Sequence, residues 1–147
     1  MTDPEVVLLI FDLQLNILQE GLMKQSPIFV RTYDLLRWLI PATVKFPRSQ
    51  RFVLARMVQW TALQFQERLI EAALGQEPKA RLTEADVLLT KLRFYLRLCC
   101  DLNLFNEGQY AHVAQMVAEV GRLLGGWQKK VRGGEGKPRT FAPQPLI

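Results

Sequence analysis

The sequence predicts an all-α protein: an antiparallel four-helix bundle, in up-down-up-down order, within residues 23–128. Two observations favour this fold. Apolar residues recur at intervals of three and four through the middle of the chain, whereas no segment shows the sustained alternation of a strand. The chain of 147 residues has the size of one domain with a buried core, and its hydrophobic content of 49% is typical of a folded protein.

The first bundle helix should begin after Ser26, with Ser26 as N-cap and Pro27 at the first helical position, where a missing N–H is harmless. Pro41 should kink or loosen its last turn, because proline removes a backbone hydrogen bond. Pro47 marks the break that follows. The face expected to contact the core carries Phe29, Tyr33, Leu36 and Ile40.

The second helix is predicted over residues 49–74 and should end at Gly75. Its core face should carry Leu54, Val58, Phe65 and Leu69, with Ala62 and Ala73 allowing close approach. Two further apolar stripes consist of Phe52, Leu63 and Ile70, and of Val53, Met57 and Trp60. We therefore expect this helix to be covered on more than one side, either as the central helix or by another subunit.

A polar connection over residues 76–81 precedes the third helix, which should start at Thr83, since Thr83 and Asp86 resemble a capping box. Its core face should carry Ala85, Leu88, Leu89, Leu92, Tyr95, Leu96 and Cys99. Each residue advances a helix by about 100°, so Val87, Phe94 and Leu98 project from the opposite face. The N-terminal segment or the tail could cover these three side chains, but we favour an interface between copies of the chain.

The fourth helix should be capped by Asn106 with Gln109 three residues later. Its inner face should carry Tyr110, Val113, Ala114, Val117, Gly121 and Leu124. Gly125 and Gly126 should weaken or end it. Residues 129–147 are rich in glycine, proline and basic side chains, which is typical of a flexible tail.

Residues 1–22 form an acidic segment that can make an additional helix. Asp3 can cap this helix, Pro4 suits its first position, and Gly21 can stop it. Its acidic and apolar content suggests docking. The segment could pack on the basic body of the same chain or on a partner, or it could arise from an upstream start codon.

Charge is distributed unevenly along the chain, although the net charge is only +5. Residues 1–23 hold four acids and no base, whereas nineteen bases face ten acids from Lys24 onward, a net charge of +9. A body with this charge attracts polyanions, whether nucleic acid or an acidic protein or membrane surface.

Three basic clusters are candidate nucleic-acid contacts, because lysine and arginine neutralise phosphates. They consist of Lys45, Arg48, Arg51 and Arg56; of Arg93 and Arg97; and of Arg122, Lys129, Lys130 and Arg132. Each could instead be a solvated helix face. Trp38 lies on the less apolar side of the first helix, where it could stack on a base, but we favour a place in a subunit interface.

Catalytic chemistry has little support in the sequence. His112, the only histidine, is expected on the solvated face of the fourth helix. Cys99 and Cys100 are adjacent, so they favour a reduced, cytoplasmic environment over a disulfide, and with one remote histidine they make no zinc site. We expect no enzyme activity, no cofactor, no metal and no membrane partner.

Four segments read, in order, YDLLRWLIP, KFPRSQRFVL, KLRFYLRLCCDLNLF and QYAHVAQMVAEVGRLLGGW. Together, over residues 26–128, they resemble the accessory variability protein, Avd, of diversity-generating retroelements, a family related to the four-helix bundle proteins of ribosomal RNA intervening sequences. The resemblance implies a non-catalytic protomer that assembles into a barrel-like homopentamer. It also implies binding to the element's reverse transcriptase and to template RNA or cDNA, in support of mutagenic retrohoming.

The resemblance also bears on single residues and on the ends of the chain. It makes Arg48, Arg51, Arg93, Arg97 and Arg122 the candidate nucleic-acid contacts within the matching motifs. The acidic N-terminal segment and the C-terminal tail fall outside it. The alternatives are a four-helix protein of a ribosomal RNA intervening sequence and a structural oligomer without a nucleic-acid role.

Overall fold

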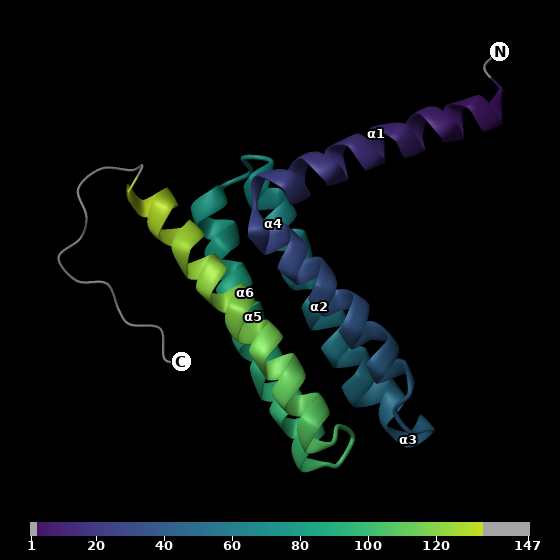
Figure 1. The fold of residues 1–147 in the computed structure, drawn as a ribbon, viewed down its shortest axis with the longest axis vertical. Helices are drawn as coiled ribbons and strands as arrows, with labels where there is room; N and C mark the ends of the chain where they lie inside the picture. Colours follow the sequence, from purple (N-terminus) through teal and green to yellow (C-terminus); the bar gives the residue numbers. More distant parts are fainter. Residues whose placement is uncertain (1–2, 134–147) are drawn as a thin grey trace.

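The computed structural model describes residues 3–133, except for the side chains of residues 19 and 22–25. This part of the chain is helical and contains no strand, which confirms the predicted all-α class (Figure 1). Its five long helices are α1 (Pro4–Gln25), α2 (Pro27–Val44), α4 (Arg56–Ala73), α5 (Pro78–Asp101) and α6 (Glu107–Gly133). A single turn, α3 (Arg48–Gln50), and a π-helical turn, Arg51–Ala55, lead into α4.

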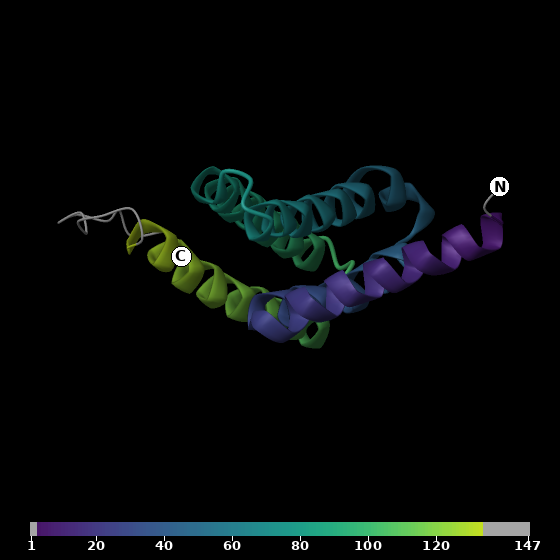
Figure 2. The same ribbon diagram turned by 90° about the horizontal axis from the view of Figure 1, so that it is seen from above.

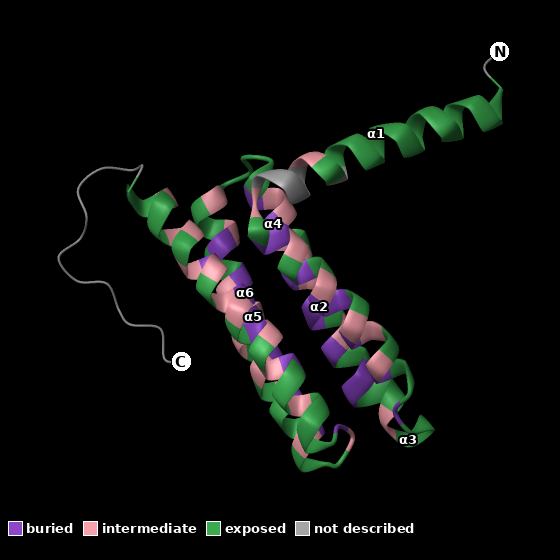
Figure 3. Ribbon diagram, in the orientation of Figure 1, coloured by how far each residue is buried: buried purple, intermediate pink, exposed green. Residues whose placement is uncertain are grey.

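Four of the long helices, α2, α4, α5 and α6, surround one hydrophobic core, and each runs antiparallel to the next (Figures 1 and 2). Helix α6 also packs on α2, which closes the bundle. Buried residues follow the inner faces of these helices (Figure 3). The largest fully buried side chains are Ile28, Leu35, Leu39, Val58, Phe65, Leu69, Leu82, Leu89, Leu92, Leu96, Val113 and Leu124.

Helix α1 projects away from this bundle, and its residues are coloured as exposed along most of its length (Figures 1 and 3). The backbone N–H of Glu5 donates to Asp3 Oδ1 at 3.1 Å, as expected of an N-cap. The predicted stop at Gly21 is wrong, because the helix continues to Gln25. One glycine weakens a helix by only about 1 kcal/mol, whereas a residue before proline, here Ser26, is forced out of helical geometry.

The connection from α2 to α4 differs from the continuous second helix expected over residues 49–74. Helix α2 passes through Pro41 to Val44, and the chain then enters α3 and the π-helical turn. The hydroxyl of Thr43 donates to the Leu39 carbonyl at 3.0 Å and accepts from Gln59 Nε2 at 2.9 Å. This pair of bonds ties the last turn of α2 to the start of α4.

Helix α4 ends as predicted at Gly75, which has a φ of 81°. The N–H groups of Gly75 and Gln76 donate to the carbonyls of Ala72 and Glu71, both at 3.1 Å. This is a Schellman motif, whose left-handed residue is usually glycine because it has no Cβ to clash.

Helix α5 begins at Pro78, so the start predicted at Thr83 is wrong. Pro78 fits the first position of a helix. This signal is stronger than the capping box suggested by Thr83 and Asp86. The hydroxyl of Thr83 donates to the Lys79 carbonyl at 3.0 Å, within the helix. Helix α5 ends in a second Schellman motif, with Asn103 in the left-handed region at a φ of 59° and the N–H of Leu104 bonded to the Cys99 carbonyl at 2.8 Å.

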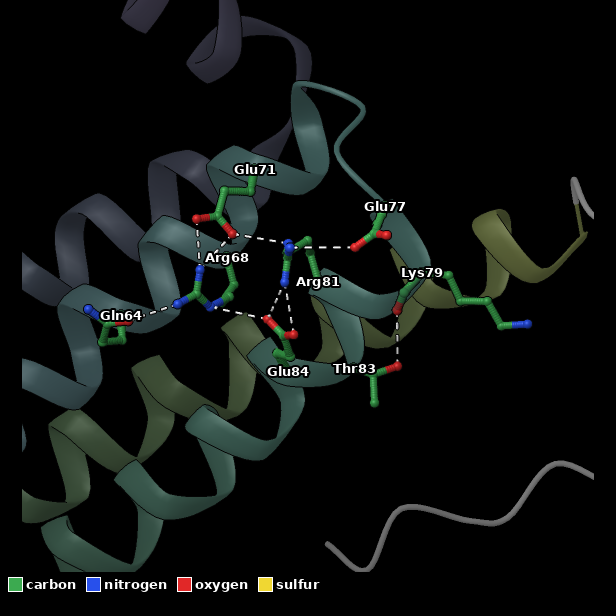
Figure 4. A network of polar contacts seen from close by, with 8 residues as sticks. All are labelled: Gln64, Arg68, Glu71, Glu77, Lys79, Arg81, Thr83 and Glu84. Atoms are coloured by element: carbon green, nitrogen blue, oxygen red, sulfur yellow. Dashed lines mark hydrogen bonds and ion pairs between the residues drawn. The ribbon is translucent and has the colours of Figure 1, made fainter.

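Ion pairs join α4 to α5 near the turn between them (Figure 4). Arg68 Nε lies 3.2 Å from Glu84 Oε2, and Arg81 Nε lies 3.3 Å from Glu71 Oε2. Arg81 also pairs with Glu77 at 3.5 Å. These contacts fix the register of the two helices and neutralise two arginines with three carboxylates.

The predicted cap of α6 is confirmed. The N–H of Gln109 donates to Asn106 Oδ1 at 2.8 Å, and the N–H of Asn106 donates to Gln109 Oε1 at 3.0 Å. Gly125 and Gly126 were expected to weaken or end this helix; they do not end it, since the helix continues to Gly133. Tertiary contacts of residues beyond the two glycines explain why the helix continues.

The last turns of α6 contact the bundle beyond the two glycines. The ring centroid of Trp127 lies 6.1 Å from that of Phe29, and Val131 packs against the core. Residues 129–133 therefore belong to α6, and the rest of the predicted tail, 134–147, lies outside the described residues.

Two predicted core positions are also corrected. Tyr33 is 37% exposed, because the core face of α2 centres on Thr32, Leu35 and Leu39. Ala73 is exposed as well, and Ala72 takes the buried place beside it.

Candidate nucleic-acid interface

The first group of basic residues lies where α2 connects to α4. Lys45, Arg48, Arg51 and Arg56 are all exposed there, and we call them the basic corner. Arg51 Nε donates to the Phe46 carbonyl at 2.9 Å, which holds this side chain at the turn. From residue 35 to residue 66 the sequence contains five bases and no acid. No carboxylate of this stretch therefore opposes the charge of the corner.

A second basic group lies at the other end of the bundle, where α6 ends and α2 begins. Arg122, Lys129, Lys130 and Arg132 are exposed on the last turns of α6. Arg122 and Lys130 line a cleft of about 490 Å³ that also contacts residues 26–29 at the start of α2. Lys130 and Arg132 lie in the last turn of α6, where a positive charge also complements the helix dipole, so these two residues have a structural role beside any binding role.

The third pair, Arg93 and Arg97, lies between the two ends. Arg93 is half-buried and its guanidinium crosses α6 over Gly121, so close that a Cβ at residue 121 would overlap Arg93 Nη2. Arg97 is exposed, with Nε 3.2 Å from Asp101 Oδ1 and its guanidinium carbon 5.9 Å from the centre of the Tyr110 ring. A hydrogen bond to Tyr110 and the charge of Asp101 raise the pKa of Arg97.

These two arginines line a surface groove of about 400 Å³ between α5 and α6. Apolar and aromatic side chains form the rest of its lining, which includes Phe94, Tyr110, Ala114 and Ala118. The groove thus combines cationic groups with flat apolar surfaces, which is the combination that stacks and neutralises single-stranded nucleic acid.

The ten basic residues of the three clusters therefore occupy three places on one protomer rather than one surface. Helix α2 has 18 residues, so the two basic ends are separated by roughly 27 Å, at 1.5 Å of rise per residue. One extended nucleic-acid strand, or contacts with several copies of the protein, would be needed to engage them together.

Trp38, which we assigned to an interface, is half-buried against its own chain. Its ring centroid lies 5.6 Å from that of Phe105 and 5.4 Å from that of His112. His112 is exposed, as expected, and its ring contacts this tryptophan at a tilted interplanar angle of 54°. In contrast, Val87, Phe94 and Leu98 are 51%, 68% and 43% exposed in the single chain.

The close contact between Arg93 and Gly121 was not anticipated from the sequence. The available signal was the glycine itself, which interrupts an otherwise apolar inner face of α6. A glycine at such a position often marks the close approach of another group.

Among the described residues, no group of three or more histidine, cysteine or acidic side chains could hold a metal ion. Burial raises the pKa of the Cys99 thiol to about 12, so this group is protonated at neutral pH and is a poor nucleophile. Within the same part of the chain, no helix is long and apolar enough to cross a membrane.

A protein-family model described as bAvd-like matches residues 27–131. The chain belongs to the bAvd-like family. The match confirms the recognition of an Avd-type protein and spans α2 through nearly all of α6. Helix α1 lies outside the bAvd-like match. No curated protein matches the chain.

The contact of Arg93 with Gly121 predicts a small change in stability. Gly126→Ala should raise the free energy of unfolding by about 1 kcal/mol, because alanine favours the helix and nothing lies near the added methyl group. Gly121→Ala should raise it by less, because the methyl group displaces the Arg93 guanidinium. Urea denaturation of both variants measures the difference.

Arg93→Ala provides the control background, since it removes the group that the methyl displaces. In this background Gly121→Ala should gain as much stability as Gly126→Ala. Equal gains for both substitutions in the presence of Arg93 would contradict the packing of its guanidinium on α6.

Proposed function

We propose that this bAvd-like protein is a non-catalytic accessory subunit of a diversity-generating retroelement. It binds template RNA or cDNA and the element's reverse transcriptase, and it supports mutagenic retrohoming in the cytoplasm. The observation that carries this proposal is the family match over residues 27–131, which includes the whole bundle core.

The distribution of ion pairs supports a nucleic-acid role for the basic corner. Several bases elsewhere are neutralised within the protomer, as in the pairs Arg31–Glu119 at 3.0 Å and Arg97–Asp101 at 3.2 Å. Arg48 and Arg56 are exposed and form no ion pair within residues 3–133. Unpaired surface bases bind phosphates and release their counterions, so the corner is the strongest candidate for the first contact with the nucleic acid.

Assembly into a barrel-like homopentamer would strengthen these contacts. Each protomer contributes one basic corner, so an assembly presents several copies to the same strand at high effective concentration. Exposed Val87, Phe94 and Leu98 supply apolar surface for association between copies.

RNA binding should depend steeply on salt and on the basic corner. The affinity for a single-stranded RNA should fall at least about tenfold between 50 and 200 mM salt, because several phosphates are neutralised. The triple variant Lys45→Gln, Arg48→Gln and Arg51→Gln should bind more weakly and reduce the slope of log K against log salt by about 2. Fluorescence anisotropy at a series of salt concentrations measures both quantities.

Arg31→Gln is the matched control for Arg48→Gln, because it also removes one exposed arginine but one that is already paired with Glu119. It should change the affinity less than Arg48→Gln does. Binding that is insensitive to salt, or equally weakened by both substitutions, would argue against phosphate recognition by the corner.

The retroelement itself predicts a gene neighbourhood. We expect a reverse transcriptase gene and a pair of template and variable repeats beside the gene for this chain. Co-purification of that reverse transcriptase with the tagged protein would then report the partner directly. A neighbourhood without a reverse transcriptase or repeats would refute the retroelement role and favour the relative from ribosomal RNA intervening sequences.

A further inference from the structure

The ion pairs between α4 and α5 show which of their exposed residues are neighbours. Arg68 pairs with Glu84 and Glu71 with Arg81, so residues at the same level of these antiparallel helices have numbers that sum to about 152. Trp60 of α4 therefore lies level with Leu92 of α5, and the first turn of α4 lies level with the last turns of α5.

This register places two sets of exposed apolar side chains at similar levels of α4 and α5, outside the buried core. We call this surface the outer face. Its exposures run from 39% for Met57 to 68% for Val53 and Phe94. The outer face consists of Val53 in the π-helical turn, Met57 and Trp60 on α4, Val87, Phe94 and Leu98 on α5, and Leu102 just after α5. Phe94 lies at its edge, where it also borders the groove between α5 and α6. A patch of this kind on a monomer marks an interaction surface.

The apolar side chains of helix α1 are also exposed to solvent in the single chain. The ten large apolar residues from Val6 to Leu18 are between 45% and 69% exposed. Two rows repeat at intervals of four, three and four residues: Val6, Ile10, Leu13 and Ile17; and Val7, Phe11, Gln14 and Leu18. Adjacent rows of this spacing fit a helix that packs against two helices at once.

We infer that α1 of one copy docks on the outer face of a second copy, between α4 and α5. This inference rests on the proposed homo-oligomer. It assigns α1 of a neighbouring copy as the element that covers the outer face. Residues 1–23 carry four acids and no base. On the receiving helices, Lys91 and Arg56, the member of the basic corner that lies on α4, are exposed and make no ion pair with any described residue. The acidic helix and these two bases are thus complementary in charge, as α1 and the outer face are in apolar surface.

The connection between α1 and α2 favours a second copy over the same chain. Only Ser26 separates the two helices, and one residue spans at most about 3.6 Å. Helix α2 lies in the layer with α6, opposite the layer of α4 and α5 (Figure 2). To reach its own outer face, α1 would have to cross the bundle, roughly 20 Å for two helix diameters. An anionic membrane is disfavoured because α1 is acidic.

Disulfide trapping between two differently tagged full-length proteins tests the docking. Both carry Cys100→Ser; one also carries Ile10→Cys and the other Phe94→Cys. After co-expression and mild oxidation, we expect a disulfide-linked heterodimer on a non-reducing gel. Asp12→Cys replaces Ile10→Cys in the control, because residue 12 lies on the opposite side of α1, and it should give at least about tenfold less cross-linked product.

The mass in solution and the RNA affinity of the same samples separate this inference from the proposed function. An oligomer that binds RNA but gives no heterodimer, or gives equal amounts with Asp12→Cys, overturns the docking of α1 and leaves the proposed function standing. A disulfide formed only within one chain, in a protein with both cysteines, overturns docking between copies. A protein that is monomeric at all concentrations overturns both the docking and the proposed oligomer.

A second measurement distinguishes docking in the populated assembly from a rare encounter that a disulfide has trapped. Ile10→Glu should raise the dissociation constant of the assembly at least about tenfold, because it places a charge in the apolar contact. Asn16→Glu, on the polar side of α1, should leave it within about twofold. Equal effects of the two substitutions would overturn the placement of α1.

Discussion

The protomer has more apolar helix surface than its own core can accept, and this constraint shapes the rest of the structure. The inner faces of α2, α4, α5 and α6 are buried, with side chains such as Phe65 and Leu89 at 0% exposure. Burial of each large apolar side chain stabilises the fold by roughly 1.5–3 kcal/mol. Trp60, Phe94 and the apolar residues of α1 stay exposed in the single chain. Their burial on association would stabilise an assembly in the same way. The fold thus provides both a stable bundle and the surfaces for association.

Charge is divided in a similar way between structure and binding. Near the turn between α4 and α5, Arg68 and Arg81 share three carboxylates and serve the register of the bundle. At the opposite end of α4, the basic corner has no acidic neighbour in sequence. The protomer therefore uses its paired bases to hold helices together and leaves unpaired ones at the surface, where an anionic strand can reach them.

Local signals predicted those helix ends that depend on local chemistry. The cap formed by Asn106 and Gln109 and the left-handed Gly75 are set by residues within one turn, and both were predicted. The glycines at 21, 125 and 126 did not end their helices. For α6, contacts of Trp127 with Phe29 outweigh the low helix propensity of glycine.

The candidate site was predictable in its residue types but not in its arrangement. Clusters of arginines mark basic surfaces in any sequence. The placement of Arg93 over Gly121, and of Trp38 between Phe105 and His112, depends on how distant helices meet. Such contacts follow from tertiary packing, which spacing along one helix does not specify.

Hydrogen exchange of the α1 backbone tests most directly whether the exposed apolar surfaces cover each other between copies. A lone helix opens readily, whereas a docked helix is protected. We predict that amides of residues 6–18 exchange rapidly in dilute, monomeric protein and become protected as the concentration is raised through assembly. Rapid exchange in the assembled protein, or protection that is already complete in the monomer, would contradict this account.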